Sequence, residues 1–335
     1  MKKKVLSIIL CVCYLLTLVS CANKQDTGSV GKEAAVSGEE AKKLQIVTTS
    51  FPPYDFVRQI AGDNVEVTML LAPGTESHSY EPTPSDMIAI KNCDLFIYGG
   101  GESEEWVKEL ASSLEKDESQ MISMMEVVEL LKEETVEGMQ ADDHDHGEEE
   151  HEEEDAHEDV EYDEHVWTSP KNVMAISAKI AEVLGQVDSQ NKEVYEANLT
   201  KYLTELEAID EAFREVVEHA ERTTFVFGDR FPFRYFAAEY GLDYYAAFPG
   251  CSTETEPSAA TIAFLINKVK ETEIPVVFYT EFSNQKIADT VCEATGAKKM
   301  IFYATHNISK DDFQAGKTYV DFMKLNIESL KEALQ

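Results

Sequence analysis

Five side chains that can bind a metal ion stand at turns or at the ends of apolar segments of this sequence. They are His78, His165, Asp229, Glu281 and His306. Two imidazoles with carboxylates or a third imidazole form a ligand set that suits Zn²⁺, and Mn²⁺ is the alternative where carboxylates dominate. A cysteine ligand is not among them, which argues against a closed structural zinc site.

The local sequence around the first two histidines predicts that both are held in place. His78 stands between a turn at Pro73-Gly74 and a stiff Glu-Pro-Thr-Pro run, and Thr83 is placed to cap a helix that begins at Pro84. His165 comes shortly before Ser169-Pro170, where a second helix is expected to begin. A fixed imidazole is what a metal site requires, although either histidine alone is more often a hydrogen-bonded loop residue.

A segment of unusual composition precedes His165. Residues 141–165 contain fifteen Asp or Glu and five His, with no Lys or Arg. Such a stretch cannot bury a core, so we expect a solvated, disordered loop over residues 141–164. A run that served only solubility would not need histidine, and we therefore expect loose metal capture by the four loop histidines. They are His144, His146, His151 and His157.

Short β-branched or aromatic segments alternate with amphipathic stretches of helical length. The expected strands are Leu44–Thr49, Val65–Leu71, Asp94–Tyr98 and Met121–Met125 in the first half, and Thr224–Phe227, Tyr244–Phe248, Pro275–Thr280 and Lys299–Tyr303 in the second. This alternation predicts an α/β protein with two lobes, each a mainly parallel sheet flanked by helices.

One long helix is expected to join the lobes. Residues 189–222 contain no Gly or Pro, and their apolar residues step by three and four. At ~1.5 Å per residue the helix would extend roughly 50 Å, although two helices with an unmarked break remain possible. The expected lobes are therefore 44–188 and 223–335. Asp229, Glu281 and His306 each follow a predicted strand, so a cleft between the lobes would gather all five candidate ligands.

The N-terminus carries features of an export signal. Three lysines precede an apolar run that ends at Ser20-Cys21, which predicts a signal peptide over residues 1–20 and lipidation of Cys21. An ordinary signal peptide with a chance cysteine is the alternative. Residues 21–43 lack an apolar period and are expected to be a flexible tether. We expect anchoring at the outer face of the bacterial cytoplasmic membrane.

The net charge and the motifs of the chain narrow the possible classes of function. The formal net charge of −35 excludes a nucleic-acid partner and favours cations. Metallohydrolase, protease and P-loop motifs such as His-Glu-x-x-His are missing, so we expect a binding protein and not an enzyme. A metallohydrolase and a surface adhesin are the weaker alternatives. We expect Cys93, Cys251 and Cys292 to be small buried apolar residues.

Several motifs together resemble the zinc and manganese receptors of bacterial ABC importers, solute-binding protein family 9. They are TSFPPY (49–54), GTESHSYEPTPSD (74–86), the acidic loop ending in His165-Val-Trp, YFAAEYGL (235–242), Glu256-Pro-Ser and YVDFMKLN (319–326). The resemblance spans about residues 44–334. It implies two lobes joined by one long helix, a metal between them, and a monomeric receptor that delivers the metal to an importer permease.

The resemblance also implies ligands. The positions of His78 and His165 match ligating histidines, and Glu281 matches a carboxylate that some members use as a fourth ligand. This chain departs from the pattern at Arg230, where members usually carry His or Glu, because arginine cannot bind a cation at neutral pH. Glu281 and His306 are therefore expected as the second-half ligands narrowly ahead of Asp229.

Overall fold

The computed structural model describes residues 43–76, 80–114, 117–140, 161–252 and 256–335. They belong to one compact unit, Lys42–Gln335. Within these ranges, no helix is long and apolar enough to cross a membrane.

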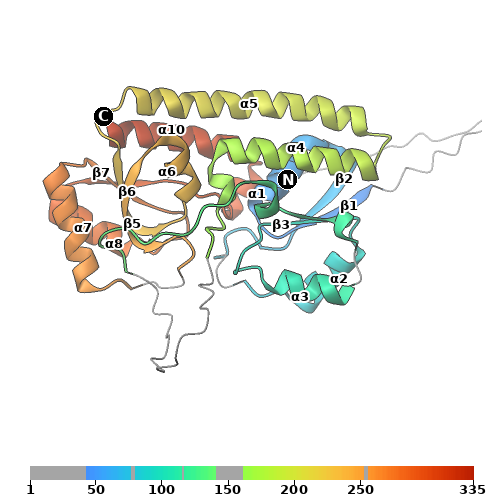
Figure 1. Ribbon diagram of the computed structural model, residues 1–335, viewed down its shortest axis with the longest axis horizontal. Coiled ribbons are helices and arrows are strands. Elements are labelled where there is room, and N and C mark those ends of the chain that lie inside the picture. The colour runs from blue at the N-terminus through green and yellow to red at the C-terminus, as the bar shows by residue number, and fades with distance from the viewer. Residues whose placement is uncertain (1–42, 77–79, 115–116, 141–160, 253–255) are drawn as a thin grey trace, which may run out of the picture. The chain divides into compact units, whose positions relative to one another are not determined.

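The unit contains two four-stranded sheets in which every strand pair is parallel (Figure 1). The first sheet has the order β2-β1-β3-β4 and the second β6-β5-β7-β8. The strands are β1 (Leu44–Thr48), β2 (Val65–Met69), β3 (Leu95–Tyr98), β4 (Met121–Ser123), β5 (Thr224–Phe231), β6 (Asp243–Pro249), β7 (Val276–Tyr279) and β8 (Lys298–Ile301). The eight predicted strands are thus confirmed, and so is the α/β class with two parallel sheets.

Ten helices accompany the strands in the described part of the chain. They are α1 (Phe51–Ala61), α2 (Pro84–Asn92), α3 (Trp106–Leu114), α4 (Pro170–Val187), α5 (Lys192–Glu218), α6 (Arg234–Tyr240), α7 (Ala259–Thr272), α8 (Lys286–Thr295), α9 (Lys310–Gln314) and α10 (Tyr319–Leu334). Helices on both faces explain why the inner strands β3 (LFIY) and β7 (VVFY) are continuous apolar segments.

Both sheets reverse their strand order next to their first strand. The chain moves from β1 to β2 on one side and then to β3 on the other, and β5 has the same relation to β6 and β7. Ligands of open α/β sheets bind outside the carboxyl ends of the strands at such switch points. Glu281 lies just after β7, and Asp229 lies near the end of β5.

The long helix α5 packs against both halves of the chain. It contacts α1 and α4 of the first half and α10 of the second, and Figure 1 shows it lying along the α4 and α10 side. Its buried face carries Tyr195, Tyr202, Leu206, Ile209 and Phe213. The helix predicted over residues 189–222 is therefore present, with ends at Lys192 and Glu218.

The loop after β8 adds a second connection between the halves. The backbone N–H of Phe51 donates to the carbonyl of His306 at 3.3 Å, and that of Gly74 donates to Ile308 at 2.8 Å. The side-chain amide of Asn307 donates to the carbonyls of Ala72 and Thr75 at 2.9 and 2.7 Å. The polypeptide that carries His306 is thus bonded to the strand ends of the opposite lobe.

The expected loop over residues 141–164 ends earlier than predicted. Tyr162 forms an antiparallel bridge with Lys132, and Asp163 and Glu164 are buried. The Glu164 carboxylate accepts hydrogen bonds from the backbone and hydroxyl of Ser103. The last acidic residues before His165 therefore belong to the folded body, because their oxygens find donors there.

A buried carboxylate ties α10 to α1. Asp55 on α1 is fully buried and accepts the backbone N–H of Tyr319 at 2.8 Å. Burial raises the pKa of Asp55 from 3.8 to about 6, although the hydrogen bonds from Tyr319 and Gln59 oppose that rise. The folded state thus binds this proton more tightly than the unfolded chain does. The stability that Asp55 contributes is present below about pH 4 and is lost as the pH rises through about 6.

We expect Asp55→Asn to keep the acceptor for Tyr319 and to remove this loss at neutral pH. Asp55→Ala should cost about 1–3 kcal/mol at both pH values, because the buried N–H of Tyr319 loses its acceptor. Urea unfolding of the wild type and both variants at pH 4 and pH 7 provides the comparison. An Asn variant with the same pH dependence as wild type would show that the ionisation of Asp55 has no such effect.

Candidate metal site

A small cavity is lined by both halves of the chain. Its wall includes Glu76 and His165 from the first half and Asp229, Glu281 and His306 from the second. Its volume is about 60 Å³. Sites for organic ligands usually occupy about 300–1,000 Å³, so this cavity has the size for an ion. Four of the five predicted ligands are described, and all four line it.

His165 is fixed by the residues on either side of it. Its backbone N–H donates to an Oδ1 of Asp163 at 2.8 Å, and its Nδ1 lies 3.2 Å from the same oxygen. The ring also packs 5.4 Å from the ring of Trp167. A carboxylate only accepts hydrogen bonds, so this contact favours the tautomer with the proton on Nδ1 and the metal-binding lone pair on Nε2.

Charge around His165 also affects its protonation. Burial lowers the pKa of His165, but the carboxylates of Asp163, Glu164 and Glu133 together raise it above its ordinary value of 6.5. These carboxylates stabilise a positive charge on the ring. A metal ion would bring the same positive charge and would compete with the proton for it.

Glu281 presents a buried oxygen that accepts no hydrogen bond from the described part of the chain. Its Oε2 accepts the backbone N–H of Ala304 at 2.8 Å, while its Oε1 is buried and has no hydrogen-bond partner among the described residues. Burial raises the pKa of this carboxyl from 4.5 to about 7, against the lowering effect of nearby backbone N–H groups. An unpaired buried carboxylate oxygen beside an ion-sized cavity fits a cation.

His306 reaches the cavity from the loop after β8. Its ring lies 4.8 Å from that of Trp167 and 5.6 Å from that of His165, both in edge-to-face arrangements. The indole N–H of Trp167 donates to the carbonyl of Ala304 at 2.9 Å. Thr305, which lies between Ala304 and His306, has a φ of 60°, a conformation that a β-branched residue rarely adopts. The loop therefore accepts local strain to bring His306 to His165.

Asp229 lines the cavity but uses both oxygens elsewhere. One oxygen accepts the backbone N–H and the hydroxyl of Thr280 at 2.9 and 2.8 Å, and the other accepts the N–H of Arg230 at 2.9 Å. Arg230, at the position where the resembling family has His or Glu, forms an ion pair with Glu76 at 3.7 Å. This arrangement favours a structural role for Asp229, and Glu281 and His306 fit a metal better.

The ligand atoms of the predicted set are not all close together. Among the described residues, the sets of three whose ligand atoms lie within 4.8 Å of each other do not include His165 with Glu281 or His306. The ring of His306 packs on Trp167, and one oxygen of Glu281 accepts a hydrogen bond from the backbone N–H of Ala304. His78, the four loop histidines and Cys21 lie outside the described residues and stay predictions.

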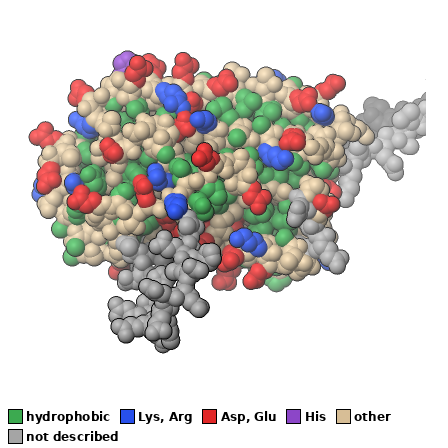
Figure 2. Space-filling view, in the orientation of Figure 1, with side chains coloured by type: hydrophobic (Ala, Val, Ile, Leu, Met, Phe, Trp, Pro, Cys, Tyr) green, Lys and Arg blue, Asp and Glu red, His purple; other side chains and the backbone are tan. Residues whose placement is uncertain are grey.

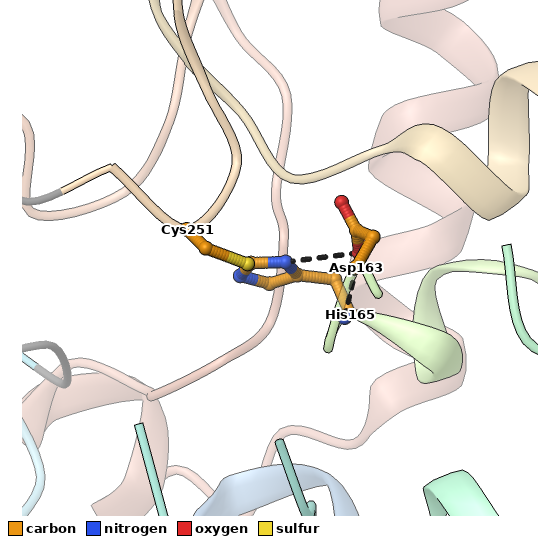
Figure 3. Close-up of side chains that lie close together, drawn as sticks. All are labelled: Asp163, His165 and Cys251. Carbon is orange, nitrogen blue, oxygen red and sulfur yellow. Dashed lines mark hydrogen bonds and ion pairs between the residues drawn. The ribbon is translucent and has the colours of Figure 1, made fainter. Parts of the chain in front are cut away.

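The sequence reading missed two residues next to His165. Asp163, His165 and Cys251 form a set with ligand atoms within 4.8 Å, drawn in Figure 3. Burial, Asp163 and Glu133 raise the pKa of the Cys251 thiol. Cys93 is buried as expected, whereas Cys251 and Cys292 are only partly buried. The Asp-x-His spacing offered a signal for Asp163, but no sequence spacing pointed to Cys251.

Acidic side chains extend well beyond the cavity. Figure 2 shows them spread over the face in view among fewer Lys and Arg side chains. This distribution follows from the 64 acidic and 29 basic residues of the chain. A field of this sign attracts cations and raises their local concentration near the protein.

The chain is similar to known proteins along most of its length. A family model described as the periplasmic zinc-uptake complex component A matches residues 46–333. The zinc-binding lipoprotein AdcA of Streptococcus pneumoniae is 33% identical over 330 residues, which are 98% of this chain and 61% of that relative. The chain therefore spans less than two thirds of that relative's length.

Other relatives match from end to end. The high-affinity zinc uptake system protein ZnuA of Bacillus subtilis is 33% identical over 333 residues, covering 97% of this chain and 96% of that protein. The Zn(II)-bound ZnuA-like domain of Streptococcus pneumoniae AdcA superposes with a TM-score of 0.70 at 31% identity, covering 88% of this chain and 99% of the domain. The laminin-binding protein Lmb of Streptococcus agalactiae, described as bifunctional with adhesin and metal transporting activity, gives a TM-score of 0.71 at 25% identity, covering 87% and 100%. The chain belongs to the family of the zinc-uptake complex component A.

Proposed function

We propose that this protein binds one zinc ion in the cavity between its two sheets and delivers it to an ABC-type importer. The observation that carries the proposal is the buried Oε1 of Glu281, which lacks a hydrogen-bond partner among the described residues and lies in a cavity shared with His165 and His306. A cation would satisfy that oxygen. Two imidazoles and a carboxylate are a common zinc ligand set.

Zinc is favoured over manganese by the donors. Imidazole nitrogen suits zinc, whereas manganese prefers sites dominated by carboxylate and carbonyl oxygen. His78 remains a proposed fourth ligand. A receptor needs no general base, so the proposed protein is a carrier and not an enzyme. The likeness to a laminin-binding protein makes adhesion a second candidate role, for which the cavity offers no support.

The proposed carrier acts outside the cytoplasm as a monomer. The permease of the importer is its proposed partner, and Cys21 is its proposed lipid anchor at the outer face of the cytoplasmic membrane. A tethered receptor keeps its captured ion close to the permease, because a flexible linker raises the effective concentration at its attachment point.

The ligand assignment is tested by zinc-dependent stabilisation. Zinc that bridges both halves stabilises the folded state by about 2.7 kcal/mol at 100 times its Kd, because it binds only the folded protein. Glu281→Gln, His306→Ala and His165→Ala should each lose most of the rise in melting temperature that zinc produces. Asp229→Asn is the matched control, since Asp229 is bonded to Thr280 and Arg230. It should lower the starting melting temperature and keep the zinc-dependent rise.

An opposite pattern would overturn the assignment. If Asp229→Asn lost the zinc response while Glu281→Gln and His306→Ala kept it, the ion would lie on the other side of the cavity. If all four variants kept it, the cavity would not be the zinc site.

The pH dependence has a definite direction. Burial raises the pKa of Glu281 to about 7, and nearby carboxylates raise that of His165, so zinc must displace a proton from each group wherever that group is protonated. Zinc affinity should therefore fall as the pH drops below about 7, by up to about tenfold per pH unit for each proton displaced. Titration calorimetry in two buffers of different ionisation enthalpy counts the released protons.

The metal-free protein should show the reverse trend in stability. Because the pKa of Glu281 is raised in the folded state, the stability that it contributes is lost as the pH rises through about 7. Glu281→Gln should remove that loss.

For the zinc titration, a wild-type affinity that is constant between about pH 5 and 8 would contradict ligation by Glu281 and His165.

The anchor is tested by one substitution. Cys21→Ala should leave export intact and release the protein from the membrane, because the acyl chains would have no attachment point. Fractionation of cells that express wild type or variant distinguishes the two outcomes. Membrane retention of a normally processed Cys21→Ala protein would show that Cys21 is not the anchor.

A further inference from the structure

A second group of metal-binding atoms lies directly beside His165. Asp163, His165 and Cys251 place an oxygen, a nitrogen and a sulfur within 4.8 Å of one another. Figure 3 shows the Cys251 side chain, carried by the loop after β6, directed at the imidazole, with Asp163 bonded at Nδ1. Sequence distance separates the thiol from the other two, so only the fold brings them together.

The approach of this loop to Asp163 depends on a glycine. A Cβ on Gly250 would lie 3.0 Å from an Oδ2 of Asp163 and 2.9 Å from the carbonyl oxygen of Phe231. Any other residue there would force the loop or its neighbours to shift, because the contact with Phe231 is too close for a Cβ. The backbone N–H of Cys251 then donates to Glu133 at 2.9 Å, which fixes the start of its side chain.

Asp163 is held by its backbone as well. The hydroxyl of Tyr235 donates to the carbonyl of Asp163 at 2.8 Å and accepts the N–H of Leu131 at 3.2 Å. The N–H of Asp163 donates to the carbonyl of Leu131 at 3.0 Å. The carboxylate that meets His165 and Cys251 is therefore on rigid backbone, as a metal ligand must be.

Further carboxylates surround the thiol. Glu133, Glu161 and Cys251 form a second set with ligand atoms within 4.8 Å, and it shares the sulfur with the first set. Two overlapping sets concentrate negative charge around one thiol. A divalent cation would offset that charge, and thiolate, imidazole and carboxylate are all ligands that zinc accepts.

We propose that Asp163, His165 and Cys251 form a second zinc position, adjacent to the cavity, from which the ion passes to the cavity through His165. The proposal rests on the proposed function. His165 lines the cavity and also belongs to the set with Asp163 and Cys251, so one imidazole serves both positions and one ion occupies them in turn. Three protein ligands leave a fourth position open, as at zinc sites that exchange a ligand.

The binding step balances as a ligand exchange. Zn²⁺ replaces the proton of the Cys251 thiol and forms a Zn–S bond, and the imidazole donates the lone pair of a ring nitrogen that carries no proton. One proton from the thiol, and a second where the ring loses its own, go to solvent. When the ion moves to the cavity, the thiolate takes up a proton again.

Cobalt(II) is the probe, because a Co²⁺–thiolate bond gives a charge-transfer band in the near ultraviolet that carboxylate and imidazole do not give. The full chain is used with Cys11, Cys13 and Cys21 replaced by serine. Glu281→Gln and His306→Ala are then combined to weaken the cavity, so that the ion rests on the thiolate side. We expect one equivalent of Co²⁺ to produce the band.

Adding Cys251→Ser to that background should abolish the band. Adding Cys292→Ser instead, the matched control at another partly buried cysteine, should leave it unchanged. Absence of the band in the cavity double variant, or its survival in Cys251→Ser, would overturn the proposal. Circular dichroism and a melting curve establish that each variant is folded.

The proposed function is judged by a different result. It fails if zinc does not stabilise the protein with an intact cavity, whatever the cobalt spectrum shows. The thiolate position fails if the band is absent while that stabilisation is present. The two claims therefore have separate readouts.

Discussion

The burial of the Glu281 carboxylate is the constraint around which the second half of the protein is arranged. One buried oxygen of Glu281 has no hydrogen-bond donor among the described residues. Burying such an oxygen is costly, and its neighbours explain how that cost is limited. One oxygen is bonded to Ala304, the carboxyl holds a proton up to about pH 7, and two imidazoles lie across the cavity. A cation in the cavity would bind the unpaired oxygen, replace the proton of the carboxyl and accept lone pairs from the imidazoles.

The same constraint explains how the two lobes are connected. The loop after β8 carries Ala304 and His306, and its backbone is bonded to Phe51 and Gly74 of the first lobe. The α5 helix and the Asp55–Tyr319 hydrogen bond connect the lobes away from the cavity. A cavity of this size requires such connections, because ligand atoms must be held within a few tenths of an ångström.

Sequence patterns predicted the fold closely because strands buried on both faces are continuous apolar segments. The apolar segments predicted β3 and β7 in this way, and the apolar stripe of residues 189–222 predicted α5. Strand ends pointed to Asp229 and Glu281 for the same reason. The sequence could not show which of the two is the better ligand, because that depends on the hydrogen bonds that Asp229 accepts from Thr280 and Glu281 accepts from Ala304.

Two other features were missed in the sequence. Asp163 and Glu164 look like more of the acidic loop, yet both are buried. The Glu164 carboxylate accepts hydrogen bonds from the distant Ser103, and the carbonyl of Asp163 accepts one from Tyr235. Cys251 approaches His165 from a distant loop, in which Gly250 allows close contact with Asp163 and Phe231. Long-range packing of this kind leaves no period or spacing in the chain.

Anomalous diffraction at the zinc absorption edge, from crystals grown with one equivalent of zinc, tests the central claim most directly. The account predicts one strong peak in the cavity, within bonding distance of His165, His306 and Glu281. A strong peak elsewhere on the protein, with the cavity free of anomalous density, would contradict it.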